Sequence, residues 1–278
     1  MSLRGAVGAE AIYFLRLLRF ARNDRKNILM EAIGIIPARF GATRFDGKLL
    51  ADFCGKPVIQ HTWENAKKSK AIEDLLIATD DKRIYNAAKG FGAKAIYTSK
   101  AHKSGSDRLT EAVASIDANI VVNIQADEPL MHPAMIDDVV SAIQKDKTIQ
   151  MATICHKVRD GHELVNPNVV KVVFDRNGLA LYFSRSPIPY NANTENRTTN
   201  NYKHIGLYAY TKDFLFTFKS LPQSRLEKIE KLEQLRVIEN GYKIKVIETK
   251  HDTVGIDTPE DLVKATELVK GSRQLSFL

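Results

Sequence analysis

The chain has 278 residues, of which 44% are hydrophobic and 27% are charged, and its net charge is +8. This length and composition are those of an ordinary globular protein with one large α/β domain or two small ones. Its two cysteines, Cys54 and Cys155, lie far apart without a CxxC motif. This spacing argues against a disulfide framework and a zinc site and favours a reducing, cytoplasmic setting.

The positive charge is concentrated at the N-terminal end. Residues 1–29 hold six cations and two carboxylates, so they supply four of the eight net charges. Their apolar patch is too short and too charged to span a bilayer, and it lacks the features of a secretory signal. An Arg-rich amphipathic segment can also be a transit peptide or a surface-binding helix. We predict a disordered extension over residues 1–31, a folded domain over 32–270 and a tail over 271–278.

Strands and helices alternate in the first half of the folded domain. Short apolar runs suited to buried strands are separated by segments with helical spacing, which is the pattern of βαβ units and a mostly parallel sheet with helices on both faces. The expected strands lie within residues 34–37, 74–81, 94–99 and 119–130. The expected helices lie within residues 55–70, 83–92 and 109–116. Polar loops follow these strands, at the edge where open α/β sheets bind ligands.

The second half changes character. Residues 151–218 are predicted to form a smaller antiparallel subregion that supports a homodimer, with Asn177-Gly178 as a hairpin turn and a long surface loop over 186–201. One helix is expected from Ser224 to Gly241, followed by a strand. The last helix should begin with Thr258 as its N-cap and Pro259 at its first position.

A cationic loop follows the first expected strand. Residues 35–48, IIPARFGATRFDGK, place Arg39, Arg44 and Lys48 beside two glycines. Five residues separate those glycines and Leu49 follows the lysine, so the spacing of a nucleotide-binding P-loop is not met, and no GxGxxG opens a helix. The loop therefore either binds an anion through its side chains or is a basic surface loop.

Two aspartates lie at the ends of expected strands. Asp127 and Glu128 follow a buried strand in QADEP, and Asp257 precedes the last helix. Mg²⁺ takes one or two carboxylates and completes its shell with water and phosphate oxygens, so Asp127 and Asp257 are candidate ligands of one metal site. The alternatives are a solvated acidic turn at Asp127 and a favourable charge of about 0.3–1 kcal/mol at the helix N-terminus for Asp257.

Several segments in order resemble the cytidylyltransferases that activate 3-deoxy-manno-octulosonate (Kdo). The resemblance extends from about Ile33 to Ala265. Its segments are IIPARFGATRFDGKLL, GKPVIQHTWENA, IATDD, SGSDR, NIQADEP, NPNVVKVVFD, ALYFSRSPIP, HIGLYAY, LEQLRVIENG and GIDTPEDL. The resemblance implies a Rossmann-like nucleotidyltransferase fold that transfers CMP from CTP to Kdo and releases pyrophosphate, for lipopolysaccharide biosynthesis.

The resemblance also implies site residues. The nucleotide site matches Arg39, Lys48, Ser104, Gly105, Arg108 and Gln125. The sugar-acid site matches Arg44, Gln125, Arg185, His204, Tyr208, Glu233 and Gln234. The implied Mg²⁺ ligands are Asp127 and Asp257, and the residues implied in catalysis are Arg39, Lys48, Asp127 and Asp257. The expected partners are therefore CTP and Kdo, with neither nucleic acid nor membrane insertion.

The chain departs from the family at two places. It has Phe45-Asp46-Gly47-Lys48-Leu49 where the family usually has Leu-Pro-Gly-Lys-Pro, so the loop lacks two prolines and gains a carboxylate near the expected phosphates. Ala126 stands where the family usually has glycine. If that position requires a positive φ, alanine costs roughly 1 kcal/mol there.

Two alternatives to this function stay open. The first is the same reaction with another sugar acid, such as a sialic acid or 8-amino-Kdo. The second is a non-catalytic protein whose Arg-rich residues 1–29 bind nucleic acid or an anionic membrane surface.

Overall fold

A computed structural model of the chain describes residues 29–41, 44–102, 104–158, 160–192 and 201–275. The predicted extension lies almost entirely outside the described residues, and so does the central part of the predicted surface loop over 186–201. The first described strand begins at Met30.

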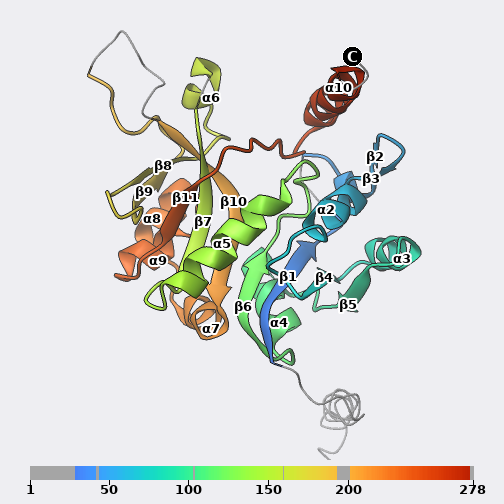
Figure 1. Cartoon of the computed structure of the whole chain (residues 1–278), viewed down its shortest axis with the longest axis horizontal. Coiled ribbons are helices and arrows are strands. Elements are labelled where there is room, and N and C mark those ends of the chain that lie inside the picture. The colour runs from blue at the N-terminus through green and yellow to red at the C-terminus, as the bar shows by residue number, and fades with distance from the viewer. Residues whose placement is uncertain (1–28, 42–43, 103, 159, 193–200, 276–278) are drawn as a thin grey trace, which may run out of the picture.

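A parallel sheet forms the first half of the fold. Its strands are β1 (Met30–Ala38), β4 (Asp74–Thr79), β5 (Lys94–Tyr97) and β6 (Ala118–Asn123). β1 lies between β4 and β6 and pairs in parallel with both, and β5 lies parallel to β4 at the edge (Figure 1). The alternation predicted from the sequence is confirmed for this half of the chain.

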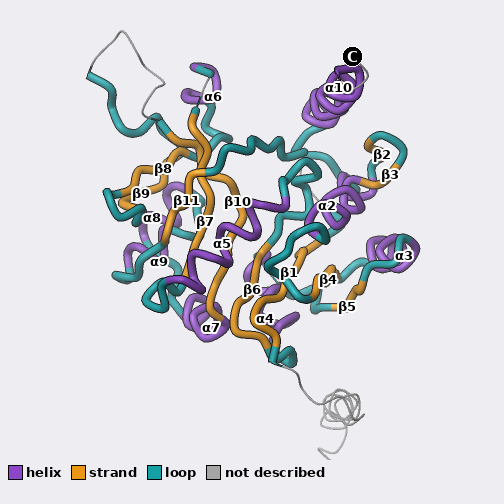
Figure 2. The backbone as a smooth tube through the Cα atoms, viewed as in Figure 1, coloured by secondary structure: helices purple, strands orange, loops and turns teal. Residues whose placement is uncertain are grey.

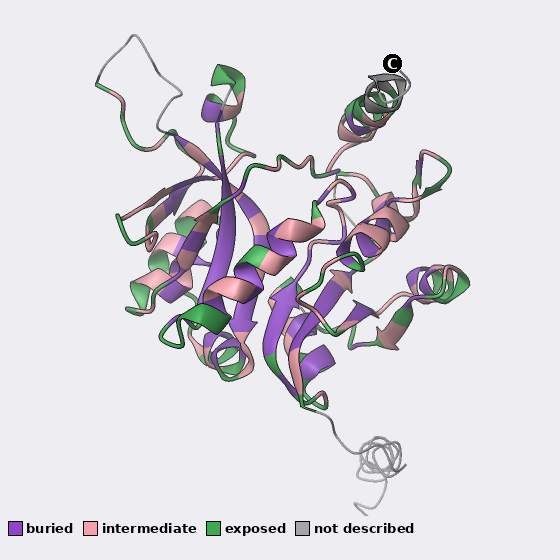
Figure 3. Ribbon diagram, viewed as in Figure 1, coloured by how far each residue is buried: buried purple, intermediate pink, exposed green. Residues whose placement is uncertain are grey.

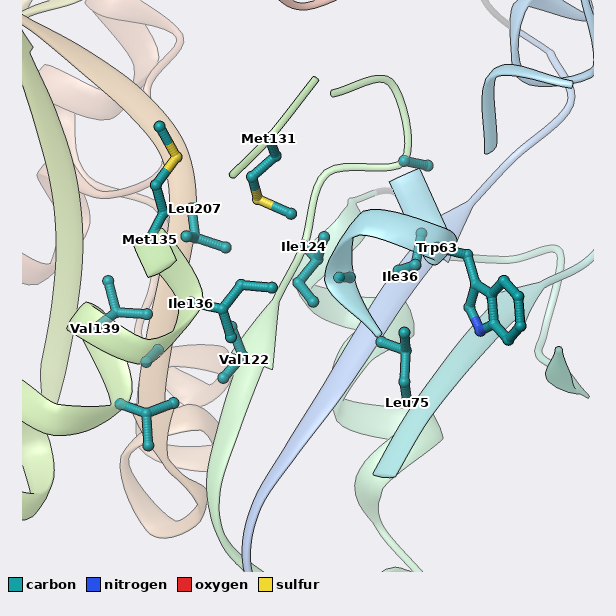
Figure 4. Packing of buried hydrophobic residues seen from close by; sticks show 14 of the residues in the cluster. Ile36, Trp63, Leu75, Val122, Ile124, Met131, Met135, Ile136, Val139 and Leu207 are labelled. Carbon is teal, nitrogen blue, oxygen red and sulfur yellow. The ribbon is translucent and has the colours of Figure 1, made fainter. Parts of the chain in front are cut away.

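Helices cover both faces of this sheet. They are α2 (Val58–Ala66), α3 (Lys82–Gly90), α4 (Gly105–Val113) and α5 (Pro133–Lys145). β1 alternates between the two faces, because Ile36 packs in the layer of α2 and α5, whereas Ile35 packs in the layer of α4. Figure 4 shows the first layer, in which Trp63 of α2 and Ile136 of α5 lie against the sheet.

The second half extends the same sheet. Its strands are β7 (Met151–Lys157), β8 (Lys171–Phe174), β9 (Ala180–Ser184), β10 (Tyr202–Thr211) and β11 (Lys245–Glu248), and two further helices are α6 (Gly161–Val165) and α7 (Lys212–Ser220). β10 pairs antiparallel with β6, β7 and β8, so the antiparallel strands join the parallel ones directly (Figure 2). β11 pairs in parallel with β7. The predicted hairpin is confirmed between β8 and β9, where Gly178 has a φ of +71°.

The single helix predicted from Ser224 to Gly241 is wrong. The structure has two short helices, α8 (Arg225–Glu230) and α9 (Leu235–Glu239), because Lys231 ends α8 in the left-handed conformation with a φ of 56°. That conformation costs a non-glycine residue roughly 1–2 kcal/mol. Burial of Leu232 and Leu235 in the core offsets this cost, so packing overrides the helical pattern here.

The last helix begins as predicted. Thr258 Oγ1 accepts a hydrogen bond from the Asp261 amide, and Asp261 Oδ2 accepts one from the Thr258 amide, so α10 (Pro259–Leu275) has a reciprocal cap. α10 projects from the body of the fold beside the short η1 (Lys48–Leu50), β2 (Asp52–Phe53) and β3 (Lys56–Pro57) region (Figure 1). None of the helices in the described part of the chain has the length and apolar character that a membrane span requires.

The core leaves no room for a side chain at Gly34. Figure 3 shows that the central strands are buried along most of their length, and a Cβ atom at Gly34 would lie 2.8 Å from Leu75 Cδ1 and 2.9 Å from Ile72 Cδ1. We expect Gly34→Ala to lower the free energy of unfolding by about 1–3 kcal/mol, as overpacking does. Urea unfolding measures this change. Gly90→Ala is the matched control, because nothing lies within 4 Å of a Cβ there and the residue is helical. An equal loss in both variants would contradict the packing explanation.

Candidate active site

The cationic loop, the end of β6, the start of α4 and the segment before α10 surround one cavity of about 370 Å³. Its lining residues are Pro37, Ala38, Arg39, Arg44, Lys48, Leu49, His102, Ser104, Gly105, Arg108, Gln125, Ala126, Asp127, Glu233 and Asp257. All of the predicted nucleotide-site residues and both predicted metal ligands are in this set. We call it the first cavity.

Lys48 joins the two aspartates in the first cavity. Its Nζ lies 2.6 Å from Asp127 Oδ2 and 2.8 Å from Asp257 Oδ1, and its side chain is only 12% exposed. Arg44 Nη2 lies 2.8 Å from the other oxygen of Asp257. Burial alone would lower the pKa of Lys48, but the two carboxylates hold that pKa above its ordinary value. Burial likewise opposes the ionisation of Asp257, yet Lys48 and Arg44 lower its pKa.

The same arrangement suits a divalent cation. Two carboxylates that come from distant parts of the chain converge on a single positively charged atom. Mg²⁺ binds such a pair when water and phosphate oxygens complete its shell. No cluster of three or more potential metal ligands exists among the described His, Cys, Asp and Glu residues.

Arg39 and Arg108 supply charge in different ways. Arg39 is exposed at the end of β1, and no ion pair holds it within the described residues. Arg108 is only 4% exposed; its Nη2 donates to Asp80 Oδ2 at 2.9 Å and its Nη1 to the Thr98 hydroxyl. Arg39 is therefore available to an incoming anion, whereas Arg108 is a fixed part of the wall.

The start of α4 forms another part of the wall. Ser104 caps the helix, since its Oγ accepts from the Asp107 amide at 3.1 Å. Gly105 lies against Pro37, because a Cβ there would be 3.8 Å from Pro37 Cγ. His102 also lines the first cavity and pairs with Glu111. Sequence reasoning missed His102, a lone histidine in a polar turn that no spacing rule singles out.

A second cavity of about 270 Å³ adjoins the first and shares Gly105, Gln125 and Glu233 with it. Its other lining residues are Ser106, Asn123, Met151, Gly206, Tyr208, Tyr210, Phe218, Lys231, Leu232 and Gln234. Four predicted sugar-acid residues line it, namely Gln125, Tyr208, Glu233 and Gln234. Arg44, a fifth, lies in the first cavity.

Arg185 and His204 are not among the described residues that line either cavity. Arg185 Nε donates to the Glu230 carbonyl and its Nη1 to the Pro167 carbonyl, both at 2.8 Å. A ring nitrogen of His204 lies 2.9 Å from Thr153 Oγ1. Neither residue lines a cavity with the other five, although the His204 ring lies 5.3 Å from that of Tyr208, and their role stays a prediction.

His204 is neutral at physiological pH. Its ring contacts Phe183 and Tyr208, and burial lowers the pKa of His204 to about 3. The pKa of a histidine in an unfolded chain is about 6.5. Below that pH the unfolded chain binds a proton on His204 that the folded chain does not bind, so the stability of the protein falls as the pH drops. We expect the His204 ring resonances to stay at neutral positions from pH 8 to pH 5 in NMR spectra. A midpoint between pH 6 and 7 would contradict this.

The structure gives one of the departures in the cationic loop, Phe45, a packing role. Phe45 packs against the apolar cluster of Phe53, Val58, Ile256 and Ala265, so it fixes the loop to the base of α10. Asp46 is exposed and is not among the residues that line either cavity. Its charge contributes to the raised pKa of Arg83, whose main cause is the hydrogen bond to Asp81.

Ala126 carries no backbone strain. It is not among the residues with a positive φ in the described chain, and its carbonyl accepts a hydrogen bond from Thr62 Oγ1 at 3.0 Å. The roughly 1 kcal/mol that alanine costs in the left-handed region therefore does not arise here.

Known proteins are similar to this chain in sequence and in fold. A family model described as cytidylyltransferase matches residues 33–244. The 3-deoxy-manno-octulosonate cytidylyltransferase of Geobacter sulfurreducens is 46% identical over 250 residues, which are 87% of this chain and 100% of that protein. The enzyme of the same name from Thermodesulfovibrio yellowstonii is 49% identical over 245 residues, which are 84% of this chain and 96% of that protein.

Solved structures agree. A CMP:2-keto-3-deoxy-manno-octonic acid synthetase complexed with CTP superimposes with a TM-score of 0.82 at 41% identity, over 87% of this chain and 99% of that one. A cytidylyltransferase from Leptospira borgpetersenii superimposes with a TM-score of 0.57 at 18% identity, over 88% of this chain and 96% of that one. The second similarity shows the fold alone.

Proposed function

The chain belongs to the family of 3-deoxy-manno-octulosonate cytidylyltransferases, and from this membership we propose that it transfers CMP from CTP to Kdo for lipopolysaccharide biosynthesis. In this reaction the oxygen of the anomeric hydroxyl of Kdo loses its proton and forms a bond to the α-phosphorus of CTP. The bond between the α-phosphorus and the oxygen that bridges to the β-phosphate breaks, and pyrophosphate leaves. The observation that carries the proposal is the pair of adjoining cavities, which share Gln125 and Glu233 and so can hold two substrates side by side.

The first cavity suits a nucleoside triphosphate. A triphosphate brings about four negative charges, so a hydroxyl oxygen must approach an anion, and cations lower that barrier. Arg39 and Lys48 are the residues that we assign to the phosphates. Ser104, Gly105 and Arg108 would contact the rest of the nucleotide.

We propose that Asp127 and Asp257 hold Mg²⁺ when the triphosphate is bound. The ion would neutralise phosphate oxygens during the transfer. Lys48 neutralises the same two carboxylates in the structure described here, and the phosphates would offer its ammonium group an alternative partner.

The second cavity suits the sugar acid. Gln125, Tyr208, Glu233 and Gln234 present amide, phenol and carboxylate groups to it, and such groups bind hydroxyls. Arg44, at the edge of the first cavity, is our candidate for the carboxylate of Kdo.

We also propose a homodimer that acts in the cytoplasm without nucleic acid. Exposed apolar side chains within residues 151–218, among them Val165, Leu181 and Tyr190, support an interface on this half of the molecule. Cys54 and Cys155 are both free thiols, which supports a reducing compartment.

Pyrophosphate release from CTP, measured with Kdo, 8-amino-Kdo and a sialic acid in parallel, tests the substrate. We expect the highest kcat/KM with Kdo. Turnover of another sugar acid without turnover of Kdo would contradict the proposed substrate. Deletion of residues 1–28 tests the alternative of a non-catalytic protein that binds nucleic acid or membrane. Such a protein would show no cytidylyl transfer with or without that segment, whereas the proposed enzyme should keep its activity after the deletion.

A further inference from the structure

We propose that Asn123, which lines the second cavity, determines specificity for the sugar acid by accepting a hydrogen bond from one substrate hydroxyl. This inference rests on the proposed function. It adds a residue that neither the family resemblance nor the spacing of the sequence motifs assigned to the site.

Asn123 has a buried acceptor without a partner. It is the last residue of β6, it is 4% exposed, and its Oδ1 has no hydrogen bond within the described chain. A buried polar atom without a partner costs roughly 1–3 kcal/mol, so such atoms usually have a structural or functional reason. His156 Nδ1 is the other such side-chain atom of the described residues, but His156 lines neither cavity.

Tyr210 lines the same cavity as Asn123. Tyr210 is 2% exposed, and burial raises the pKa of its phenol, while a hydrogen bond from Asn123 opposes that rise. Tyr210 therefore lies next to Asn123 in the wall of the second cavity. Asn123 Oδ1 has no partner within the described chain, so it is the group that is left for a ligand.

Glu233 provides a second acceptor on the wall of the same cavity. Its Oε2 accepts from Ser106 Oγ at 2.7 Å, whereas its Oε1 has no hydrogen-bond partner among the described residues. Two acceptors without donors are complementary to hydroxyl groups and repel a carboxylate. The hydroxyl-bearing part of the sugar acid should therefore enter the second cavity, and its carboxylate should point to the cations of the first cavity.

The test combines a variant with substrate analogues. Asn123→Leu has a similar volume and removes the acceptor, and the substrates are Kdo and its 4-, 5-, 7- and 8-deoxy analogues. We expect Asn123→Leu to lower kcat/KM for Kdo about tenfold, which is the upper range for one neutral hydrogen bond. With the one analogue that lacks the contacted hydroxyl, the variant should show no loss relative to the wild type. The KM for CTP should stay within about twofold, because the first cavity does not contain Asn123.

Two further variants keep the test decisive. Asn119→Leu is the matched control, because Asn119 lies on the same strand, outside both cavities, and pairs with Glu31. It should keep the wild-type preference among the analogues, and a loss of that preference would attribute the effect to the strand and not to the Asn123 acceptor. Asn123→Ala serves if the leucine variant does not fold, as judged by thermal unfolding. If Asn123→Leu lowers kcat/KM by the same factor for Kdo and for every deoxy analogue, the proposed contact is contradicted. Failure of the wild type to use Kdo at all would instead overturn the proposed function, and this inference with it.

Discussion

Replacing Asp127 by asparagine should lower kcat for cytidylyl transfer roughly a hundredfold to a thousandfold, the range seen when an enzyme loses one group that stabilises transition-state charge. Asparagine keeps the shape but removes the negative charge that a divalent cation requires. Asp127 is also one of two carboxylates on Lys48 Nζ, and Asp257 remains to pair with that lysine, so the fold should persist. Pyrophosphate release at several Mg²⁺ concentrations measures the effect.

Asp74→Asn is the matched control for this variant. Asp74 pairs with Lys94 at 2.7 Å, near the start of β4 and outside both cavities, so its loss should leave kcat within about twofold because an exposed ion pair contributes little. A kcat near that of the wild type in Asp127→Asn would contradict the assignment of Asp127 to the metal site.

Replacing Lys48 by methionine should have two opposite effects. The rate of transfer should fall roughly tenfold to over a hundredfold, as expected for the loss of one charged hydrogen bond of about 1.5–3 kcal/mol to phosphate. The affinity for Mn²⁺ in the absence of CTP should rise, because Asp127 and Asp257 lose the ammonium group that neutralises them. Electron paramagnetic resonance of Mn²⁺ measures this binding without any need for turnover.

Lys56→Met is the control for the lysine variant. Lys56 pairs with Glu64 on the surface, and its side chain is 44% exposed, so neither the rate nor the Mn²⁺ affinity should change appreciably. A lower Mn²⁺ affinity in Lys48→Met than in the wild type would contradict the competition between the lysine and the metal ion for the two carboxylates.

Local patterns predicted the order of the strands and helices well. The apolar runs of β1, β4 and β6 and the cap of α10 follow rules that act over a few residues, whereas α4 begins at Gly105, four residues before the expected helix. The break at Lys231 does not, because nothing in that residue opposes a helix and only the burial of Leu232 and Leu235 fixes the turn. The continuity of the antiparallel strands with the main sheet likewise depends on contacts between distant segments.

The candidate site was predictable in part. Asp127 and Asp257 were expected at one sheet edge, and the structure places both on Lys48. Asn123 was missed, although it lies two residues before Gln125, a spacing that places two residues on one side of an extended chain. Ser106 and Tyr210 were missed because their partners are remote in the sequence.

The most direct test of the account is the ³¹P NMR spectrum of CTP incubated with the protein, Kdo and Mg²⁺. The account predicts that the signals of CTP are replaced by those of pyrophosphate and of one CMP ester in equal amounts, and that this change requires Kdo. Formation of CDP and inorganic phosphate, or an unchanged spectrum with an enzyme that is folded and supplied with Mg²⁺, would contradict it.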